Sequence, residues 1–358
     1  MHWHWLHPLV ARPGQGTAFL ALAVLVALAV DRVWGEPPAR WHPVVWMGQA
    51  LGACGRWVAP TASTGRDLKG FWLAALFWCA LAAIVLIVSA LLQAAVLYVW
   101  GAPTEVCEVI IDMPGLGLEG ACAMVGVLRF LLAALLLGLL LKPLFAFRLL
   151  LREVRAVEDA LARSLGEGRA RLAWLVSRDV TQLSADEVRQ SAIESLAENL
   201  NDSVVAPLFW FAVAGLPGAA LYRLANTADA MWGYRGMREG RYWEWAGKWA
   251  AHADDVLSWL PARITALLLA ALHGGLPARL LMQEARKTPS PNSGWPMAAM
   301  ALALGVRLAK PGVYTLHPGG HAPGPLHTQR AAAYGQKVLL ALIPSALAAL
   351  VLIAMVRG

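Results

Sequence analysis

Residues 71–100 read FWLAALFWCALAAIVLIVSALLQAAVLYVW and carry no charged side chain. Ser89 and Gln93 interrupt an otherwise apolar run. A helix needs about 20 apolar residues to cross the hydrocarbon core of a bilayer, so this stretch predicts a membrane span. Residues 121–141 and 338–356 are apolar over a similar length and predict two more.

A fourth apolar stretch, residues 17–30, is shorter and ends at Asp31. It fits a short span near the N-terminus. It also fits a signal peptide, because residues 27–29 read Ala-Leu-Ala and resemble a cleavage site, although no convincing basic segment precedes them.

The composition of the whole chain agrees with a membrane protein. Of the 358 residues, 58% are hydrophobic and 15% are charged, against about 25% charged in an average soluble domain. This excludes a disordered chain and a secreted disulfide scaffold. The four cysteines form no CxxC pair and are interpreted as core thiols. The net charge of +7 is not gathered into a basic block, so no nucleic-acid partner is predicted.

Lys and Arg instead predict the orientation of the spans. The loop at 101–120 holds four acids and no Lys or Arg, whereas nine Lys and Arg residues lie between 142 and 189. By the positive-inside rule the loop is external and the segment that begins at Lys142 is cytoplasmic. We therefore expect a multi-pass protein of a bacterial inner membrane.

Three further apolar stretches, 204–221, 264–276 and 295–308, are short or broken by Pro and Gly. They predict buried or re-entrant helices that the rest of the protein must cover. The fold class is thus all-α, a polytopic membrane protein with three to four transmembrane helices. We expect one domain over residues 1–358, with a cytoplasmic helical segment at 142–203 and site-forming segments at 31–48, 191–263 and 286–308.

Within that helical segment, apolar residues at helical spacing from Leu144 to Leu165 predict a helix that Gly166 and Gly168 end. Ser184-Ala-Asp-Glu187 fits a capping box and predicts a second helix. An apolar stripe follows on it, with acids and an amide on the other side: Ile193, Leu196, Leu200 and Val204 form the stripe, and Glu194, Glu198, Asn201 and Asp202 the polar face.

A solvated polar face is the simplest reading of these acids. However, no Lys or Arg lies among residues 191–202, and the acids run directly into an apolar segment. Other polar groups also border apolar stretches, and ionisable groups at membrane depth are commonly functional. Each has a structural alternative: Asp254-Asp255 as acids at a helix start, Arg263 as an interfacial anchor, and His42-Pro43 as a turn.

Several familiar chemistries are not predicted. The sequence has no P-loop and no HExxH motif, and its nine His residues show no zinc-ligand spacing. Gly115-x-Gly117-x-x-Gly120 matches a dinucleotide motif by letters, but it precedes a predicted span instead of following a strand.

Five segments in order resemble the CbiB/CobD family, the cobalamin-biosynthesis membrane enzymes called adenosylcobinamide-phosphate synthases. They are DRVWGEPPARWHPVVWMG (31–48), ESLAENLNDSVVAPLFW (194–210), YRLANTADAMWGYR (222–235), ADDVLSWLPAR (253–263) and SPNSGWPMAAMALALGVRL (290–308). The resemblance runs from Asp31 to Tyr314. It does not extend to the loop before residue 121 or to residues 315–337.

The resemblance implies an ATP-dependent reaction with Mg²⁺, in which a propionate of adenosylcobyric acid forms an amide with an amino-alcohol phosphate. The amine is aminopropanol phosphate or ethanolamine phosphate, and the product is adenosylcobinamide phosphate. The partners are thus a corrinoid, an amino-alcohol phosphate and the lipid bilayer, and the oligomeric state is left open.

We assign roles within these segments from residue chemistry. The expected catalytic residues are Glu194, Glu198, Asp202, Asp229 and His42. The expected substrate-binding residues are Asn199, Asn226, Arg235, Arg263, Ser290, Asn292, Asp31 and Glu36. The expected metal ligands are Glu194, Glu198, Asp202, Asp254 and Asp255, because Mg²⁺ prefers oxygen ligands; Arg178 and Lys287 are weaker candidates for phosphate.

Two other classes of protein are alternatives. A catalytically silent regulatory or sensing paralogue would have lost the acidic and Asn motifs, which are intact here. A corrinoid transporter would be expected to show inverted repeats, and the sequence shows none.

Overall fold

The computed structural model describes residues 13–62, 65–101 and 119–357 of the chain. In chain order its helices are α2 (Pro13–Val33), η2 (Ala39–Trp41), α3 (Pro43–Val58), α4 (Leu68–Gly101), α6 (Glu119–Leu141), η3 (Lys142–Leu144), α7 (Phe147–Arg163), α8 (Leu165–Leu172), α9 (Ala185–Leu200), η4 (Asn201–Val205), α10 (Ala206–Trp232), α11 (Lys248–Leu272), α12 (Ala278–Ala285), α13 (Gly294–Leu304) and α14 (Pro325–Arg357). The described residues are mostly helical, which confirms the all-α class.

The strands form two short antiparallel hairpins. β1 (Met237–Arg238) pairs with β2 (Arg241–Tyr242), and β3 (Leu308–Lys310) pairs with β4 (Tyr314–Leu316). In the second hairpin Leu308 lies opposite Leu316. Both hairpins are loop extensions of the helical fold, and the β3–β4 hairpin packs on α9.

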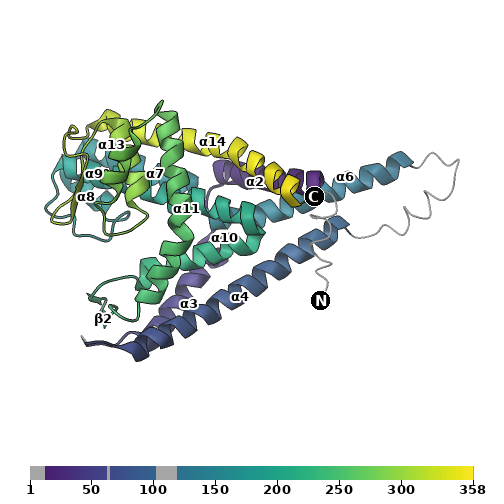
Figure 1. The fold of residues 1–358 in the computed structure, drawn as a ribbon, viewed down its shortest axis with the longest axis horizontal. Helices are drawn as coiled ribbons and strands as arrows, with labels where there is room; N and C mark the ends of the chain where they lie inside the picture. The colour runs from purple at the N-terminus through teal and green to yellow at the C-terminus, as the bar shows by residue number, and fades with distance from the viewer. Residues whose placement is uncertain (1–12, 63–64, 102–118, 358) are drawn as a thin grey trace.

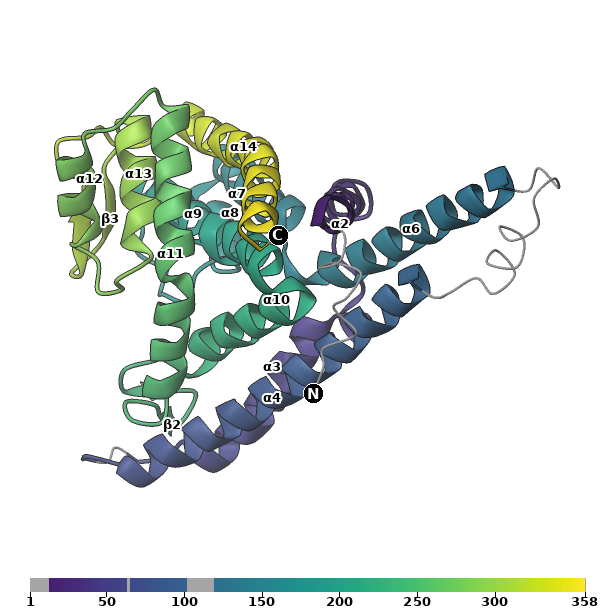
Figure 2. The ribbon, with the colours of Figure 1, turned by 45° about the vertical axis from the view of Figure 1, so that its right-hand side comes forward.

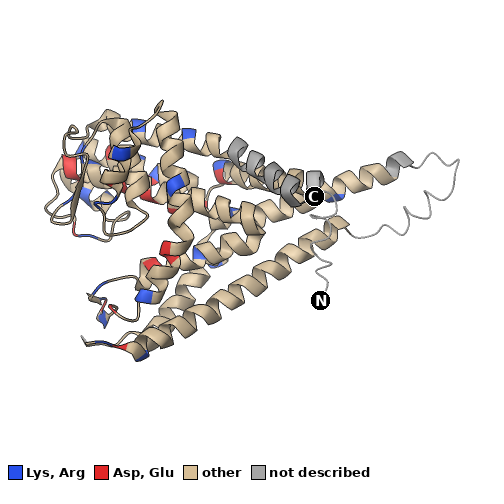
Figure 3. Ribbon diagram, in the orientation of Figure 1, with Lys and Arg blue, Asp and Glu red and all other residues tan. Residues whose placement is uncertain are grey.

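The long apolar helices extend from one charged end of the molecule. Figures 1 and 2 show α4 and α6 reaching far beyond the group of α7, α8, α9 and α13, while α11 runs across the direction of α4. In Figure 3 Lys, Arg, Asp and Glu gather in and around that group and near β2, and the long α4 is almost free of them. This separation is expected when one end lies in lipid and the other in water.

Within the described residues, five helical stretches are long and apolar enough to cross a membrane: Gly16–Val33, Leu68–Gly101, Cys122–Arg163, Ala185–Trp232 and Lys248–Leu272. The first two contain the spans predicted at 17–30 and 71–100, and the third contains all but the first residue of the span predicted at 121–141, so a polytopic membrane protein is confirmed. The span predicted at 338–356 is the second half of α14, and most of its side chains are outside the described part of the chain.

The other two stretches correct the prediction of short helices. Residues 264–276 were expected to form a short helix, but α11 begins at Lys248, because its polar first half continues the same helix. Residues 204–221 belong to the long α10 and the preceding η4. Residues 295–308 do give a short helix, since α13 has 11 residues and is almost fully buried.

A break inside α10 is stabilised by a polar residue of α4. Ala214 and Gly215 leave the helical conformation, and Gly215 has a φ of 66°, which glycine tolerates best. The freed backbone N–H of Leu216 donates to Oε1 of Gln93 at 2.7 Å. Gln93 is only 5% exposed. Its position within an apolar helix is thus explained by the hydrogen bond that it accepts from the kink.

α2 belongs to the core. Phe19, Ala23 and Ala27 are fully buried, and α2 packs on α6 and α14. Cleavage after residue 29 would remove these core side chains, so the structure favours the span over the signal peptide.

The second predicted helix is confirmed and the first needs a correction. Ser184 and Glu187 form the capping box at the start of α9, and the apolar stripe is fully buried. α7 ends at Arg163, whereas Gly166 and Gly168 lie inside α8, which Ser164 caps.

The cysteines differ from one another in exposure and bonding. Cys54 and Cys79 are free thiols, but Cys79 is exposed and Cys122 is disulfide-bonded, so the interpretation as core thiols was wrong for both of these. The acidic loop and most of the Gly-x-Gly motif at 115–120 lie outside the described residues.

We expect Gln93→Leu to destabilise the protein by about 1–3 kcal/mol, because the buried N–H of Leu216 would lose its acceptor. Thermal unfolding of the purified protein in detergent measures this loss. Ser89→Ala is the matched control in α4, because the Ser89 hydroxyl donates to the carbonyls of Val85 and Leu86 in its own helix. Equal melting temperatures for Gln93→Leu and Ser89→Ala would contradict this account of the kink.

Candidate functional site

The centre of the candidate site is the π-helix η4, which joins α9 to α10. A π-helical turn inserts a residue into an α-helix and is frequent at functional sites. Oδ1 of Asp202 accepts a hydrogen bond from Nδ2 of Asn201 at 2.8 Å and a longer one from the Tyr222 hydroxyl at 3.4 Å. That hydroxyl also lies 3.0 Å from Oγ of Ser258. The turn therefore brings Asp202 to a polar junction of η4, α10 and α11.

Two more carboxylates reach this junction. Asp229 of α10 and Asp254 of α11 lie close enough to Asp202 for all three to repel one another. Nδ2 of Asn226 and Oγ of Ser258 both donate to Oδ1 of Asp254 at 3.5 Å. The acids predicted from three separate segments are thus brought together. We call Asp202, Asp229 and Asp254 the acidic cluster.

Arg223 supplies positive charge to the cluster, and sequence reasoning missed it. Its Nη1 donates to the backbone carbonyl of Asp202 at 3.1 Å and to Oδ1 of Asn226 at 3.5 Å. It is also attracted electrostatically by Glu36 and Asp254. Its position within the 222–235 segment, one turn before Asn226, was a usable signal.

The predicted acids of α9 line a separate cavity of about 160 Å³ beside the cluster. Its wall is formed by Leu175, Val176, Ser177, Arg178, Ser191, Glu194, Ser195, Glu198, Asn199, Lys310 and Tyr314. Nη2 of Arg178 donates to Oε2 of Glu194 at 2.6 Å, and Glu194 is 3% exposed. The Asn199 amide donates to the Ser195 carbonyl at 2.9 Å.

Glu198 connects the cavity with the acidic cluster. Its carboxylate has Asp202, Glu194 and Asp229 as acidic neighbours, and Lys310 is the cation that attracts it. Lys310 comes from β3, 112 residues further along the chain, and could not be paired with Glu198 from the sequence.

The predicted residues Asp31, Glu36 and His42 gather around Lys142. Nζ of Lys142 lies 3.1 Å from Oδ1 of Asp31 and 2.9 Å from Oε1 of Glu36, and its side chain is 3% exposed. Nε2 of His42 lies 3.1 Å from the other Glu36 oxygen. Burial alone would raise the pKa of Glu36, but the hydrogen bond with His42 and the charge of Lys142 outweigh it and hold this pKa below its usual range. Glu36 is therefore a carboxylate at neutral pH.

Arg263 and Asn292 meet as a third group. Nη1 of Arg263 donates to Oδ1 of Asn292 at 3.1 Å, and the guanidinium lies over the rings of Trp259 and Trp295. Nδ2 of Asn292 donates to the backbone carbonyl of Asp255 at 2.7 Å. These bonds dock the segment before α13 on α11.

The role of Ser290 in that segment is local. Its hydroxyl accepts the backbone N–H groups of Asn292 and Ser293 at 3.2 Å each. It thereby shapes the turn that presents Asn292 to Arg263.

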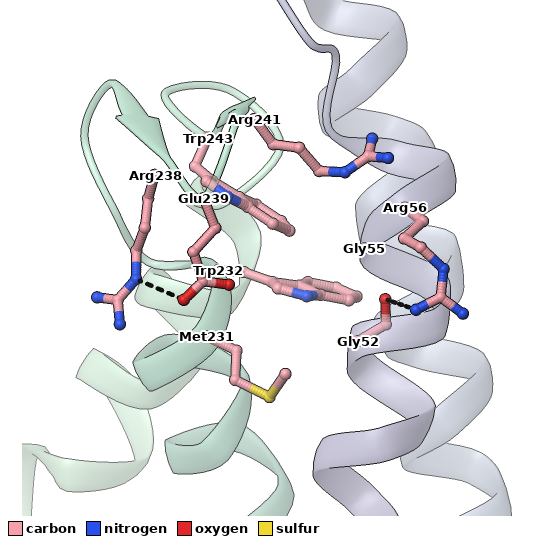
Figure 4. A pocket seen from close by; sticks show the side chains of 9 residues that line it. All are labelled: Gly52, Gly55, Arg56, Met231, Trp232, Arg238, Glu239, Arg241 and Trp243. Atoms are coloured by element: carbon pink, nitrogen blue, oxygen red, sulfur yellow. Dashed lines mark hydrogen bonds and ion pairs between the residues drawn. The ribbon is translucent and has the colours of Figure 1, made fainter.

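Arg235 lies apart from the acids. It is exposed in the turn between α10 and β1, and no contact among the described residues joins it to the acidic cluster. Nearby, the β1–β2 hairpin and α3 enclose a cavity of about 340 Å³. Figure 4 shows Trp232 and Trp243 reaching from the hairpin side toward α3. Arg241 donates to the backbone carbonyl of Ala59 at 2.6 Å, so this arginine attaches the hairpin to α3.

The predicted metal ligands do not form a complete cage. No group of three or more His, Cys, Asp or Glu side chains in the described parts of the chain is arranged to hold a metal ion. Mg²⁺ commonly takes only one or two protein carboxylates and completes its shell with water and phosphate oxygens. The oxygen donors of Glu198 and Asp202 suit that chemistry only when a phosphorylated substrate supplies further ligands, and the metal assignment stays a prediction.

We expect Lys142→Met to destabilise the protein by about 3–5 kcal/mol, because it leaves Asp31 and Glu36 as buried carboxylates without their cation. Chemical unfolding in detergent measures the change. The double variant Lys142→Met/Asp31→Asn removes one of the two charges and should recover part of the loss. If the single variant is as stable as the wild type, Lys142 does not hold these carboxylates.

A family model described as CobD/Cbib protein matches residues 24–342. A "Probable cobalamin biosynthesis protein CobD" of Methanothermobacter thermautotrophicus is 37% identical over 82% of this chain and 85% of its own length. The "Cobalamin biosynthesis protein CobD" of Chromobacterium violaceum is 38% identical over 86% of this chain and 88% of its own.

No solved structure matches the chain. The family match covers the three groups of side chains described above, the acidic cluster with its neighbouring cavity, the Lys142 group and the Arg263 group. The chain therefore belongs to the CobD/CbiB family of cobalamin biosynthesis proteins.

Proposed function

We propose that the protein is an adenosylcobinamide-phosphate synthase. It joins adenosylcobyric acid to an amino-alcohol phosphate, aminopropanol phosphate or ethanolamine phosphate, through an amide bond, with ATP and Mg²⁺. The observation that carries this proposal is the junction at η4, where the carboxylates of Glu198, Asp202 and Asp229 lie beside the amide of Asn226 in a chain of this family.

Amide formation poses two chemical tasks. A carboxylate is a poor electrophile, and ATP with Mg²⁺ supplies its activation as an acyl phosphate. Phosphoryl transfer depends mostly on positioning and on charge neutralisation. In this chain Arg223 can neutralise charge beside Asp202, and Asn226 offers an amide to the many amide groups of a corrinoid rim.

The second task is to accept a proton. The amine is an ammonium ion at neutral pH, so its nitrogen must lose one proton to water before it bonds to the activated carbonyl carbon. It must lose a second proton as phosphate leaves with its oxygen. A carboxylate near the nitrogen can take that proton as a general base. Glu198 and Asp229 suit this role because both lie among other acids, whereas His42 is already bonded to Glu36.

We infer that the protein lies in a cytoplasmic membrane and that the site is on its cytoplasmic side. The Lys and Arg residues that follow Lys142 support this orientation. So does the disulfide at Cys122, because disulfides persist in oxidising compartments and Cys122 lies at the opposite end of α6 from Lys142.

We expect Glu198→Gln and Asp229→Asn each to lower the rate of product formation by about 100-fold or more, the usual contribution of a general base or acid. The assay is mass spectrometry of the product from adenosylcobyric acid, ATP, Mg²⁺ and each of the two amines. Asp159→Asn, an exposed acid of α7, is the matched control and should keep wild-type activity.

Two results would decide against the proposal. Near wild-type rates in both acid variants would remove these residues from the reaction. A folded wild-type protein that binds adenosylcobyric acid but yields no amide with either amine would favour the regulatory paralogue.

A further inference from the structure

The cavity of about 160 Å³ between α9, residues 175–178 and the β3–β4 hairpin holds charges of both signs. Arg178 and Lys310 are its cations, and Glu194 and Glu198 are its carboxylates. Pockets for drug-sized ligands commonly enclose about 300–1,000 Å³. The cavity is thus suited to a small, zwitterionic molecule and is too small for a nucleotide.

The buried wall of the cavity carries unused hydrogen-bonding groups. Arg178 and Glu194 are joined through Nη2 and Oε2. The other guanidinium nitrogen, Nη1 of Arg178, and the other oxygen, Oε1 of Glu194, are buried and have no hydrogen-bond partner among the described residues. Buried polar groups normally have partners. Nη1 of Arg178 is therefore a donor that a ligand can satisfy, whereas the Glu194 carboxylate also has the Tyr314 hydroxyl as a neighbour.

The mouth of the cavity adds a second cation and an uncharged tyrosine hydroxyl. Lys310 is exposed there and is attracted by Glu194 and Glu198. Burial and then the charges of Glu194 and Glu198 raise the pKa of Tyr314 above its usual range, so its hydroxyl keeps its proton. Ser177, Ser191 and Ser195 also line the cavity. The hydroxyls of Ser191 and Ser195 already donate to backbone carbonyls, and that of Tyr314 donates to Sδ of Met297. The two cations and Ser177 are therefore the groups that a phosphate can use.

We propose that this cavity binds the phosphorylated amine, with Arg178 and Lys310 on its phosphate and Glu198 on its ammonium group. The identity of the amine as an amino-alcohol phosphate rests on the proposed function. Glu194 does not exclude the phosphate, because Arg178 neutralises it at 2.6 Å. Glu198 faces both the cavity and the acidic cluster, so an amine held by Glu198 points toward the place where the corrinoid carboxylate is activated.

Binding is measured first, without turnover, by isothermal titration of the full chain in detergent. The titrants are ethanolamine phosphate, aminopropanol phosphate, unphosphorylated ethanolamine, inorganic phosphate and ATP. We expect Lys310→Met to weaken both phosphorylated amines at least tenfold and to leave ethanolamine unchanged. Arg307→Met, which removes an exposed cation beside β3 and outside the cavity, should bind like the wild type.

Arg178 needs a second variant, because Arg178→Gln leaves Glu194 buried without its cation. Arg178→Gln/Glu194→Gln removes both charges and retains hydrogen-bonding side chains, so it tests the phosphate contact in a folded protein. We expect the same weakening of the phosphorylated amines. In the assay of product formation, Lys310→Met should raise KM for the phosphorylated amine at least tenfold and leave KM for adenosylcobyric acid unchanged.

The outcomes separate the two proposals. If the wild type binds neither phosphorylated amine, or if Lys310→Met and the double variant bind them like the wild type, the cavity is not the amine site. If the wild type forms product while KM for the amine is unchanged in Lys310→Met, the cavity assignment fails and the synthase stands. If the phosphorylated amines bind in a Lys310-dependent way but no product forms in any condition, the cavity is the amine site and the proposed synthase activity is wrong.

Discussion

A polar group that lies among apolar helices must find its partner inside the protein, because lipid hydrocarbon offers none. This constraint explains two polar residues of the apolar helices, Gln93 and Asp31. Gln93 is present in α4 because α10 breaks at Gly215 and frees the N–H of Leu216. Asp31 lies in the last turn of α2 beside Lys142, which follows α6 in the chain. Each of these contacts also fixes two helices relative to one another.

The same constraint gives the π-helix its importance. Asn201 and Asp202 lie where a polar helix face meets an apolar one, and their side chains cannot turn to water as they would on a surface helix. Asn201 is 2% exposed and accepts from Thr265 of α11 at 3.2 Å, while Asp202 is bonded to Asn201 and Tyr222. The turn thus links α9 and α10 to α11, and α11 carries Asp254. The packing of α10 and α11 around this turn brings the carboxylates of Asp202, Asp229 and Asp254 together.

Local signals predicted what depends on neighbours in sequence. The three apolar spans, the capping box at Ser184 and the buried stripe on α9 follow from composition and spacing, and all three are confirmed. The length of α11 was not predicted, because its first half has the polarity of a surface segment. The polar residues of this first half include Asp254, which lies at the acidic cluster, inside the protein. The hydropathy of a single segment cannot distinguish such a buried polar residue from one that is exposed to water.

Contacts between charged residues far apart in the chain could not be predicted from the sequence, for a related reason. Lys142 was counted among the charges that orient the membrane spans, yet it is buried against carboxylates 106 and 111 residues earlier in the chain. Arg223 was overlooked between Tyr222 and Asn226, although its segment was recognised. The role of a charged residue can be assigned only when the residues that it contacts are known. For Lys142 and Arg223 they include residues in other segments of the chain.

The contacts also divide the cations into those with structural partners and those with unused capacity. Lys142 is held by two carboxylates and a carbonyl. Arg263 is held by Asn292 and backbone carbonyls. A phosphate that approached either one would have to displace these partners, which are buried or fixed by helix packing. Arg178 differs, because one of its two terminal nitrogens is bonded to Glu194 while the other is left over at a cavity wall. Positive charge alone is therefore a poor guide to a phosphate site in such a protein, and donors without partners are a better one.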